Sequence, residues 1–178
     1  ETDSLQIKDN QFILIDSHFG LYDKLTEGVP ANLKFGLYLE TLCQLRMPNG
    51  RFVRWTDIRM LRRMIRDLQY RAYDPKKTVG HWHYVRRGEL KNLIPYIAKA
   101  DYVVNTSLSY ELPILKHKLF KYFPDIIQAY KDDPERQDAY IRAQRVYDLL
   151  STIETWSDES VVPQQSLLRE FIGGGIYH

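Results

Sequence analysis

Apolar residues recur at helical spacing between residues 57 and 68, and arginines occupy the opposite side of the same projection. The pattern predicts an amphipathic helix over 57–67 that packs on a core, with Thr56 or Asp57 as its N-cap. The apolar positions are Met60, Leu61, Met64, Ile65 and Leu68. The arginines, which span about a third of the helix circumference, are Arg59, Arg62, Arg63 and Arg66.

The rest of the chain alternates between strand-like and helix-like patterns. Short runs rich in β-branched, aromatic and leucine residues predict strands at 11–15, 33–42 and 101–105. Helices are predicted from Asp74-Pro75 onward, over 110–122, and from Asp133-Pro134 onward. One side of the last helix should be lined by Tyr140, Ile141, Ala143, Val146, Leu149 and Leu150. Strands separated by helices favour an α/β fold with a parallel sheet.

Composition narrows the class of protein. The 178 residues suffice for a core, and the formal net charge of +2 does not indicate a nucleic-acid-binding polycation. The single cysteine, Cys43, excludes an internal disulfide. No stretch approaches the ~20 apolar residues of a membrane span. No signal peptide is recognisable, so we predict a cytoplasmic protein that does not associate with membranes.

The arginine stripe suggests phosphate chemistry. Guanidiniums at i,i+4 repel each other, and a multivalent anion would relieve that repulsion through bidentate contacts. The alternatives are a solvated surface face or ion pairs within the protein.

Five segments, in order, carry a resemblance to a known family. The chain resembles the uridine kinase and phosphoribulokinase family of P-loop kinases, most of all the bacterial uridine kinase-like branch that can carry an N-terminal TGS domain. The arginine helix is the most specific of these segments. They are Thr56 to Asp67, Val85 to Glu89, Ala100-Asp101, Tyr110 to Lys116, and Ser166 to Gly174.

The resemblance implies a partial P-loop kinase domain with parallel strands flanked by helices. Residues 1–125 would form the C-terminal part of that domain, and residues 126–178 a helical extension packed on it. No G-x-x-x-x-G-K-[ST] loop occurs among the nine glycines. We therefore interpret the chain as the C-terminal part of a longer kinase, and predict that it is inactive alone.

The implied activity is phosphoryl transfer from ATP to a hydroxyl on a nucleoside or sugar-like acceptor, with Mg²⁺ and ATP held by the full-length parent. No tightly bound cofactor is expected on this chain. The alternative is a non-catalytic module that binds phosphate groups, RNA or a protein partner. Under the kinase interpretation, nucleic acid is not expected as a partner.

The family's site residues carry over to specific positions. Arg63 and Arg66 would contact the transferring phosphates, with support from Arg59, Arg62 and Arg71. His81 would help to bind the nucleoside. Asp16, at the end of the predicted strand 11–15, would hold Mg²⁺ through a water, although it could equally cap the following helix. His81 and His83 should diverge on a helix, which argues against a metal site there.

Overall fold

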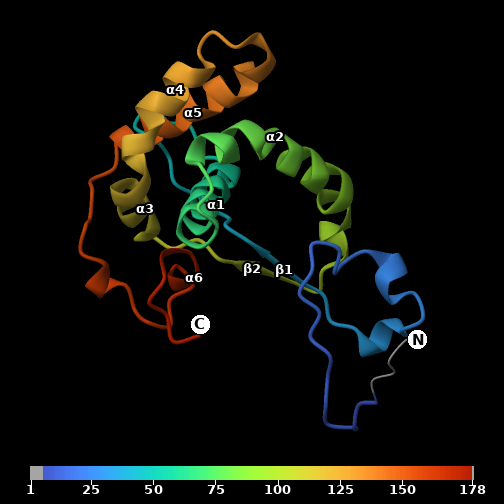
Figure 1. Ribbon diagram of the computed structural model, residues 1–178. Coiled ribbons are helices and arrows are strands. Elements are labelled where there is room, and N and C mark those ends of the chain that lie inside the picture. The colour runs from blue at the N-terminus through green and yellow to red at the C-terminus, as the bar shows by residue number, and fades with distance from the viewer. Residues whose placement is uncertain (1–5, 178) are drawn as a thin grey trace.

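A computed structural model of the chain describes residues 6–177 and shows a mixed α/β protein that is mostly helical. Two strands and six α-helices are joined by short 3-10 turns in this part of the chain (Figure 1). The strands are β1 (Leu37–Glu40) and β2 (Tyr102–Asn105). The helices are α1 (Trp55–Arg71), α2 (Pro75–Asn92), α3 (Glu111–Leu119), α4 (Phe123–Tyr130), α5 (Gln137–Ser151) and α6 (Arg169–Ile172).

The two strands form a parallel pair, as predicted. Leu37 lies opposite Tyr102 and Glu40 opposite Asn105, so the carboxyl ends of β1 and β2 meet at one edge. β1 is shorter than the predicted strand 33–42, because Leu33 belongs to a 3-10 turn and residues 34–36 and 41–42 have no partner in the ladder with β2. The chain crosses from β1 to β2 through α1 and α2, which is the βαβ connection expected of parallel strands.

The predicted strand at 11–15 does not form. Residues 11–15 pair with no strand in the part of the chain that is described, and Phe12 and Leu14 are 83% and 79% exposed. A strand needs a neighbour for its backbone hydrogen bonds, and the sheet of residues 6–177 contains only β1 and β2. Asp16 therefore does not end a central strand, and its expected position at the sheet edge is wrong.

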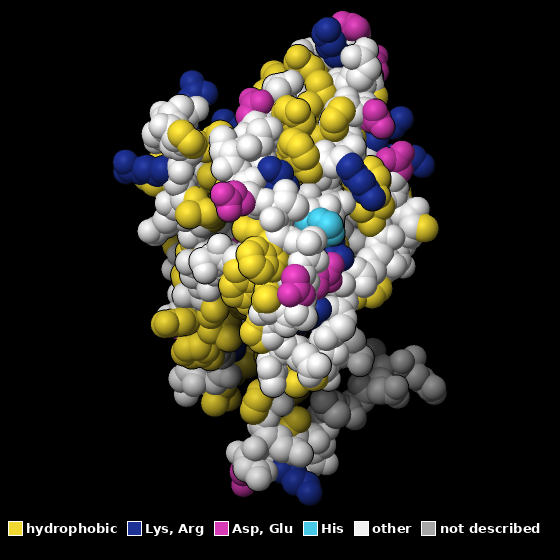
Figure 2. All heavy atoms as spheres, turned by 90° about the vertical axis from the view of Figure 1, so that its left-hand side faces the viewer, with side chains coloured by type: hydrophobic (Ala, Val, Ile, Leu, Met, Phe, Trp, Pro, Cys, Tyr) yellow, Lys and Arg dark blue, Asp and Glu magenta, His cyan; other side chains and the backbone are white. Residues whose placement is uncertain are grey.

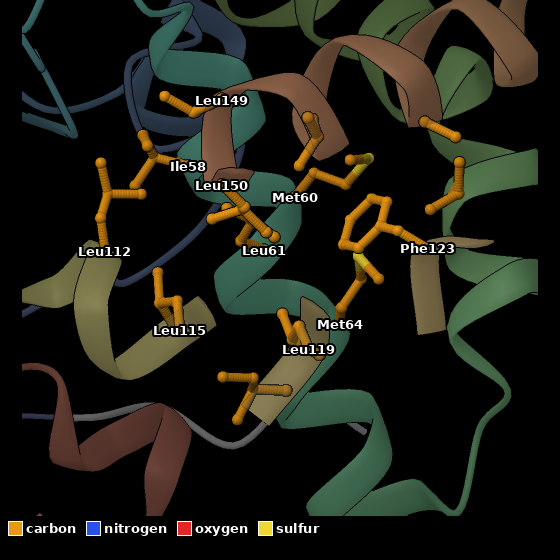
Figure 3. Packing of buried hydrophobic residues seen from close by; sticks show 14 of the residues in the cluster. Ile58, Met60, Leu61, Met64, Leu112, Leu115, Leu119, Phe123, Leu149 and Leu150 are labelled. Atoms are coloured by element: carbon orange, nitrogen blue, oxygen red, sulfur yellow. The ribbon is translucent and has the colours of Figure 1, made fainter. Parts of the chain in front are cut away.

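The core is built around α1, whose apolar face follows the predicted pattern. Met60 and Met64 point toward Phe123 of α4, while Leu61 lies among leucines of α3 and α5 (Figure 3). One cluster of buried residues extends from Val53 to Ile172. The proposed domain boundary after residue 125 falls inside α4, which contributes to this common core.

The start of α1 differs from the prediction. The helix begins at Trp55, two residues earlier than the predicted start at 57, and its N-cap residue Arg54 provides no side-chain cap. Thr56 and Asp57 lie in the first turn and are buried. The Asp57 carboxylate accepts two hydrogen bonds from the Arg145 guanidinium of α5, each over 2.7 Å. Asp57 therefore fastens α1 to α5 instead of capping α1.

Two further helix starts agree with the sequence. Asp74 accepts a hydrogen bond from the backbone N–H of Lys76 and caps α2. Asp133 caps a 3-10 turn, after which α5 begins at Gln137. Within α5, Ile141 is 54% exposed, so it does not share the buried side with the other apolar residues predicted beside it. Ala143, Val146, Leu149 and Leu150 are buried as predicted.

The helices gather at one end of the molecule and the N-terminal segment lies at the other (Figure 1). α6 lies beneath α1, at the opposite end of α1 from α4 and α5. The face formed by α3, α4 and the segment after α5 carries Lys, Arg, Asp and Glu side chains mixed among apolar ones (Figure 2). None of the helices in residues 6–177 is long and apolar enough to cross a membrane.

Candidate anion-binding site

Arg59 is held between two buried carboxylates. Its Nη1 donates to Glu40 Oε2 over 3.0 Å, and its Nη2 lies 2.6 Å from Glu89 Oε1. Glu40 ends β1, so its carboxylate lies at the sheet edge where the parallel strands finish. It also accepts a hydrogen bond from the Tyr38 hydroxyl over 3.2 Å. Burial, with the charge of Glu40, raises the pKa of Tyr38 well above its ordinary value.

Arg62 is buried and fully engaged. Its Nε donates to Glu111 Oε2 over 2.7 Å, and its Nη2 donates to the Thr106 carbonyl over 2.7 Å. Glu111 is also buried and accepts a hydrogen bond from the backbone N–H of Leu108. The guanidinium of Arg62 further lies over the ring of Phe171, 5.3 Å from its centroid. Arg62 thus joins α1 to the segment that follows β2 and to α6.

These contacts correct the expectation of a uniform arginine stripe that points away from the core. Half of the stripe faces the carboxyl ends of β1 and β2 and the first turn of α3, where acidic residues meet it. A buried guanidinium requires such partners, because an unpaired charge away from water is very costly. Arg59 and Arg62 therefore hold the fold together, and their predicted role in phosphate binding stays a prediction.

Asp67 organises the outer half of the stripe. This buried carboxylate accepts hydrogen bonds from Arg63 Nε over 2.7 Å and from Arg71 Nη1 over 3.2 Å. Thr78 on α2 donates to it as well. Arg63 and Arg71 lie four residues before and after Asp67, so one turn of α1 on each side supplies a guanidinium. Both arginine side chains remain well exposed beyond the contact, at 39% and 54%.

Arg66 is the least engaged member of the stripe. Its closest carboxylate is that of Glu170 on α6, with 3.8 Å between Nη1 and Oε1. Its Nε is buried and makes no hydrogen bond within residues 6–177. The gap to Glu170 is too long for a hydrogen bond, so the pair is an ionic contact only. The Arg66 side chain is 35% exposed, so its Nη groups, rather than the buried Nε, retain the capacity to donate to an incoming acceptor.

The charges on this outer surface do not cancel. Three guanidiniums, those of Arg63, Arg66 and Arg71, are set against two carboxylates, those of Asp67 and Glu170, which leaves one positive charge. Asp67 holds Arg63 and Arg71 in fixed positions, and the arginines keep donors that point outward. We call these three arginines with Asp67 and Glu170 the outer arginine site. Its chemistry suits a phosphate group, whose oxygens match the guanidinium fork.

His81 lies on α2, as predicted, outside the outer arginine site. The His81 Nδ1 atom lies 3.1 Å from the Lys77 carbonyl oxygen and 3.5 Å from the Tyr73 hydroxyl. His83 bonds instead to the Gly80 carbonyl, and both histidines lie on a helix, as predicted. The predicted role of His81 in nucleoside binding stays a prediction.

Asp16 does not belong to the outer arginine site. The structure places it on an exposed segment that precedes the first 3-10 turn. Among residues 6–177, no group of three or more His, Cys, Asp or Glu side chains is arranged to hold a metal ion. The expected Mg²⁺ role of Asp16 depended on its place at the end of a strand at 11–15, and that strand does not form.

The sequence analysis did not identify the carboxylates that contact the arginines of α1. Asp67 had a local signal, because Arg63 and Arg71 both lie four residues from it on one helix. Glu40, Glu111 and Glu170 had none, since they come from β1, α3 and α6. Only the packing of these elements on α1 brings them to the arginines.

Comparison with family models, with curated proteins and with solved structures gives no match for this chain.

Proposed function

We propose that this chain supplies a phosphate-binding arginine surface to a phosphotransferase of the uridine kinase type. The main supporting observation is the contrast along α1. Arg59 and Arg62 pair closely with buried carboxylates, whereas the only carboxylate near Arg66 in residues 6–177 is that of Glu170, 3.8 Å away, and the Arg66 side chain is 35% exposed. Arg66 is the primary phosphate contact, with Arg63 and Arg71 beside it. The sequence predicted that both Arg63 and Arg66 contact the transferring phosphates, and we now propose Arg66 as the main contact of the two.

Phosphoryl transfer is mostly positioning and charge neutralisation, and an arginine held by a neighbouring carboxylate suits that role. Asp67 fixes Arg63 and Arg71 before a ligand arrives, so little side-chain entropy is lost on binding. Glu170 is 46% exposed and can move away from Arg66 when a phosphate oxygen takes its place. The acceptor would be a hydroxyl on a nucleoside or a sugar-like molecule.

The residues of this chain provide phosphate contacts but not the other groups that such a kinase needs. The arginines can hold the phosphates of ATP, but the sequence lacks the glycine-rich loop that cradles them. The described residues also offer no set of side chains suited to Mg²⁺, since Asp16 stands apart from other acids of the site. We therefore assign neither metal binding nor the in-line geometry of transfer to this chain. A cytoplasmic location stays a prediction.

The test is tripolyphosphate binding to the 178-residue chain, measured by isothermal titration calorimetry. Arg66→Ala should weaken binding by about 1.5–3 kcal/mol, the range for a charge-assisted hydrogen bond. Glu170→Gln should strengthen binding, because it removes the competing carboxylate. Arg51→Ala, which removes an exposed arginine outside the site, is the matched control and should change little.

Equal losses for Arg66→Ala and Arg51→Ala would mean that only overall charge matters, and the site would be wrong. ATP offered with a panel of nucleosides and sugars should yield no phosphorylated product on this chain alone. Robust turnover would contradict that expectation. Arginine-dependent phosphate binding in a longer, loop-containing parent that phosphorylates no acceptor would favour the binding-module alternative.

A further inference from the structure

A second set of cations lines a shallow hollow between α2 and α5. We call it the α2–α5 hollow. From α2 it is lined by His83, Arg86, Arg87, Leu90 and Lys91. From α5 it is lined by Asp138 and Arg142. None of these residues belongs to the outer arginine site.

Two of the cations are fixed by contacts within the protein. Arg142 is buried, and it donates to the Val79 carbonyl over 2.8 Å and to Asp138 over 2.7 Å. Arg86 pairs with the buried Glu89 of its own helix. Two ion pairs, Arg142–Asp138 and Arg86–Glu89, therefore hold these side chains in position before any ligand binds.

The other two cations have no ionic partner in the part of the chain that the structure describes. Arg87 and Lys91 are exposed, and neither makes an ion pair with a carboxylate in residues 6–177. The hollow therefore sets four cationic side chains, those of Arg86, Arg87, Lys91 and Arg142, against the two carboxylates of Glu89 and Asp138. The balance is +2 with His83 neutral. An i,i+4 pair of like charges such as Arg87 and Lys91 costs free energy on a helix unless an anion lies between or across them.

The spacing of these cations suits an extended polypeptide. His83, Arg87 and Lys91 form an i,i+4 row along α2, in which successive side chains rise by about 6 Å. Alternate side chains of an extended strand repeat every ~6.6–6.8 Å. Leu90 lies beside this row with 59% of its surface exposed, so the row borders an apolar area. We propose that the α2–α5 hollow binds an extended acidic segment of a partner protein, with carboxylates on Arg87 and Lys91 and an apolar side chain on Leu90.

Charge and shape favour a peptide over other anions. The hollow is shallow, whereas sites for small molecules are usually enclosed. Asp138 is 43% exposed at one end of the row and would repel a continuous polyanion such as nucleic acid. A peptide can avoid this carboxylate, because its acidic residues need not be consecutive.

The test uses fluorescence anisotropy with the 178-residue chain and a labelled peptide in which glutamate and alanine alternate. The double variant Arg87→Ala/Lys91→Ala should raise Kd about tenfold or more, and added salt should weaken binding of the unaltered chain. The matched control is Arg51→Ala/Lys131→Ala, which removes the same charge from exposed positions outside the hollow and should change Kd by less than about twofold. Both variants should keep the circular dichroism spectrum and melting curve of the parent chain.

Three results would overturn the proposal. Equal weakening by the two double variants would show that net charge alone attracts the peptide. Equal affinity for a peptide with glutamine in place of glutamate would exclude the carboxylates as the recognised groups. Tighter binding of single-stranded RNA, lost in Arg87→Ala/Lys91→Ala, would assign the hollow to nucleic acid instead. Arg66→Ala should leave peptide binding unchanged, so failure of the hollow and failure of the outer arginine site are distinguishable.

Discussion

Arg62 in the middle of α1 donates to Glu111 at the start of α3, over 2.7 Å between Nε and Oε2, and both side chains are buried. The pair bridges 49 positions of sequence and holds α3 against α1 at the end of β2. Arg62 therefore has a structural role, although the sequence pattern groups it with the other arginines of α1. The neighbouring Arg66, one helical turn further along, stays at the surface.

We predict that Arg62→Ala lowers the free energy of unfolding by about 3–5 kcal/mol, because it leaves the Glu111 carboxylate buried without its partner. The measurement is urea denaturation of the 178-residue chain. Arg66→Ala is the control on the same helix and should cost less than about 1 kcal/mol, as expected for an exposed ionic contact. The joint replacement Arg62→Met/Glu111→Leu should cost less than Arg62→Ala. Similar losses for Arg62→Ala and Arg66→Ala would contradict the assignment.

Gly173 should not tolerate a side chain. It has φ 83° and ψ 177°, a backbone conformation accessible almost only to glycine, and a Cβ there would lie 2.3 Å from Gln69 Nε2 on α1. We expect Gly173→Ala to destabilise the protein by about 1–3 kcal/mol and to loosen the docking of α6, as measured by denaturation and by hydrogen exchange of residues 166–174.

The cost at Gly173 has two parts that a second variant separates. Gln69→Ala/Gly173→Ala removes the close contact but keeps the backbone strain, so it should recover only part of the loss. Gly28→Ala is the control, because a Cβ at that position meets no atom within 4 Å. Full recovery in the double variant would show that the positive φ carries no cost.

Tyr38 should make stability fall at alkaline pH. Burial and the Glu40 carboxylate raise its pKa above the ordinary 10.0, so the folded protein keeps a proton that the unfolded chain loses. The stabilisation from neutral Tyr38 is complete below pH 10.0 and declines as the pH rises above it, by up to about 1.4 kcal/mol per pH unit.

The test compares the parent chain with Tyr38→Phe by denaturation from about pH 8 to about pH 11, which spans the ordinary tyrosine pKa. Tyr38→Phe should be the less stable protein near pH 8, since it lacks the hydrogen bond to Glu40. The difference should shrink with rising pH, because only the parent loses the Tyr38 contribution. A difference that stays constant up to pH 11 would mean that Tyr38 titrates normally.

The exposed segment at 11–15 should contribute little to the stability of this chain. Phe12 and Leu14 project into solvent, so we expect Phe12→Ser/Leu14→Ser to change the free energy of unfolding by less than about 0.5 kcal/mol and to increase solubility. Leu61→Ala, in the core beside Leu150, should instead cost about 2–5 kcal/mol. A large loss for the first variant would show that this segment is buried in solution.

Patterns confined to one helix were predictable from the sequence. Met60, Leu61, Met64 and Ile65 of α1 are buried and Leu68 is partly buried, because helical periodicity fixes which residues share a face. Asp74-Pro75 begins a helix because the aspartate caps the backbone N–H of Lys76 and proline suits the first turn. These signals act over a few residues and need no distant partner.

Strand formation was predictable only where a partner existed. The runs around Leu37–Glu40 and Tyr102–Asn105 pair with each other. The run at 11–15, with similar composition, pairs with no strand in residues 6–177 and is exposed. The sequence determined that each run was suited to a strand. Tertiary structure decided which of them became one, because a strand is completed by hydrogen bonds to another segment.

For the arginines of α1, too, the sequence determined one property and the tertiary structure another. The sequence by itself determined that Arg59, Arg62, Arg63 and Arg66 share one side of a helix, since local geometry fixes that arrangement. Only tertiary structure decided their surroundings: β1, α2 and α3 bring buried carboxylates to Arg59 and Arg62, while α6 brings an exposed one near Arg66. A buried charged side chain must form an ion pair within the protein, whereas an exposed one remains free to bind a ligand. That property depends on contacts tens of residues apart, which helical periodicity does not encode.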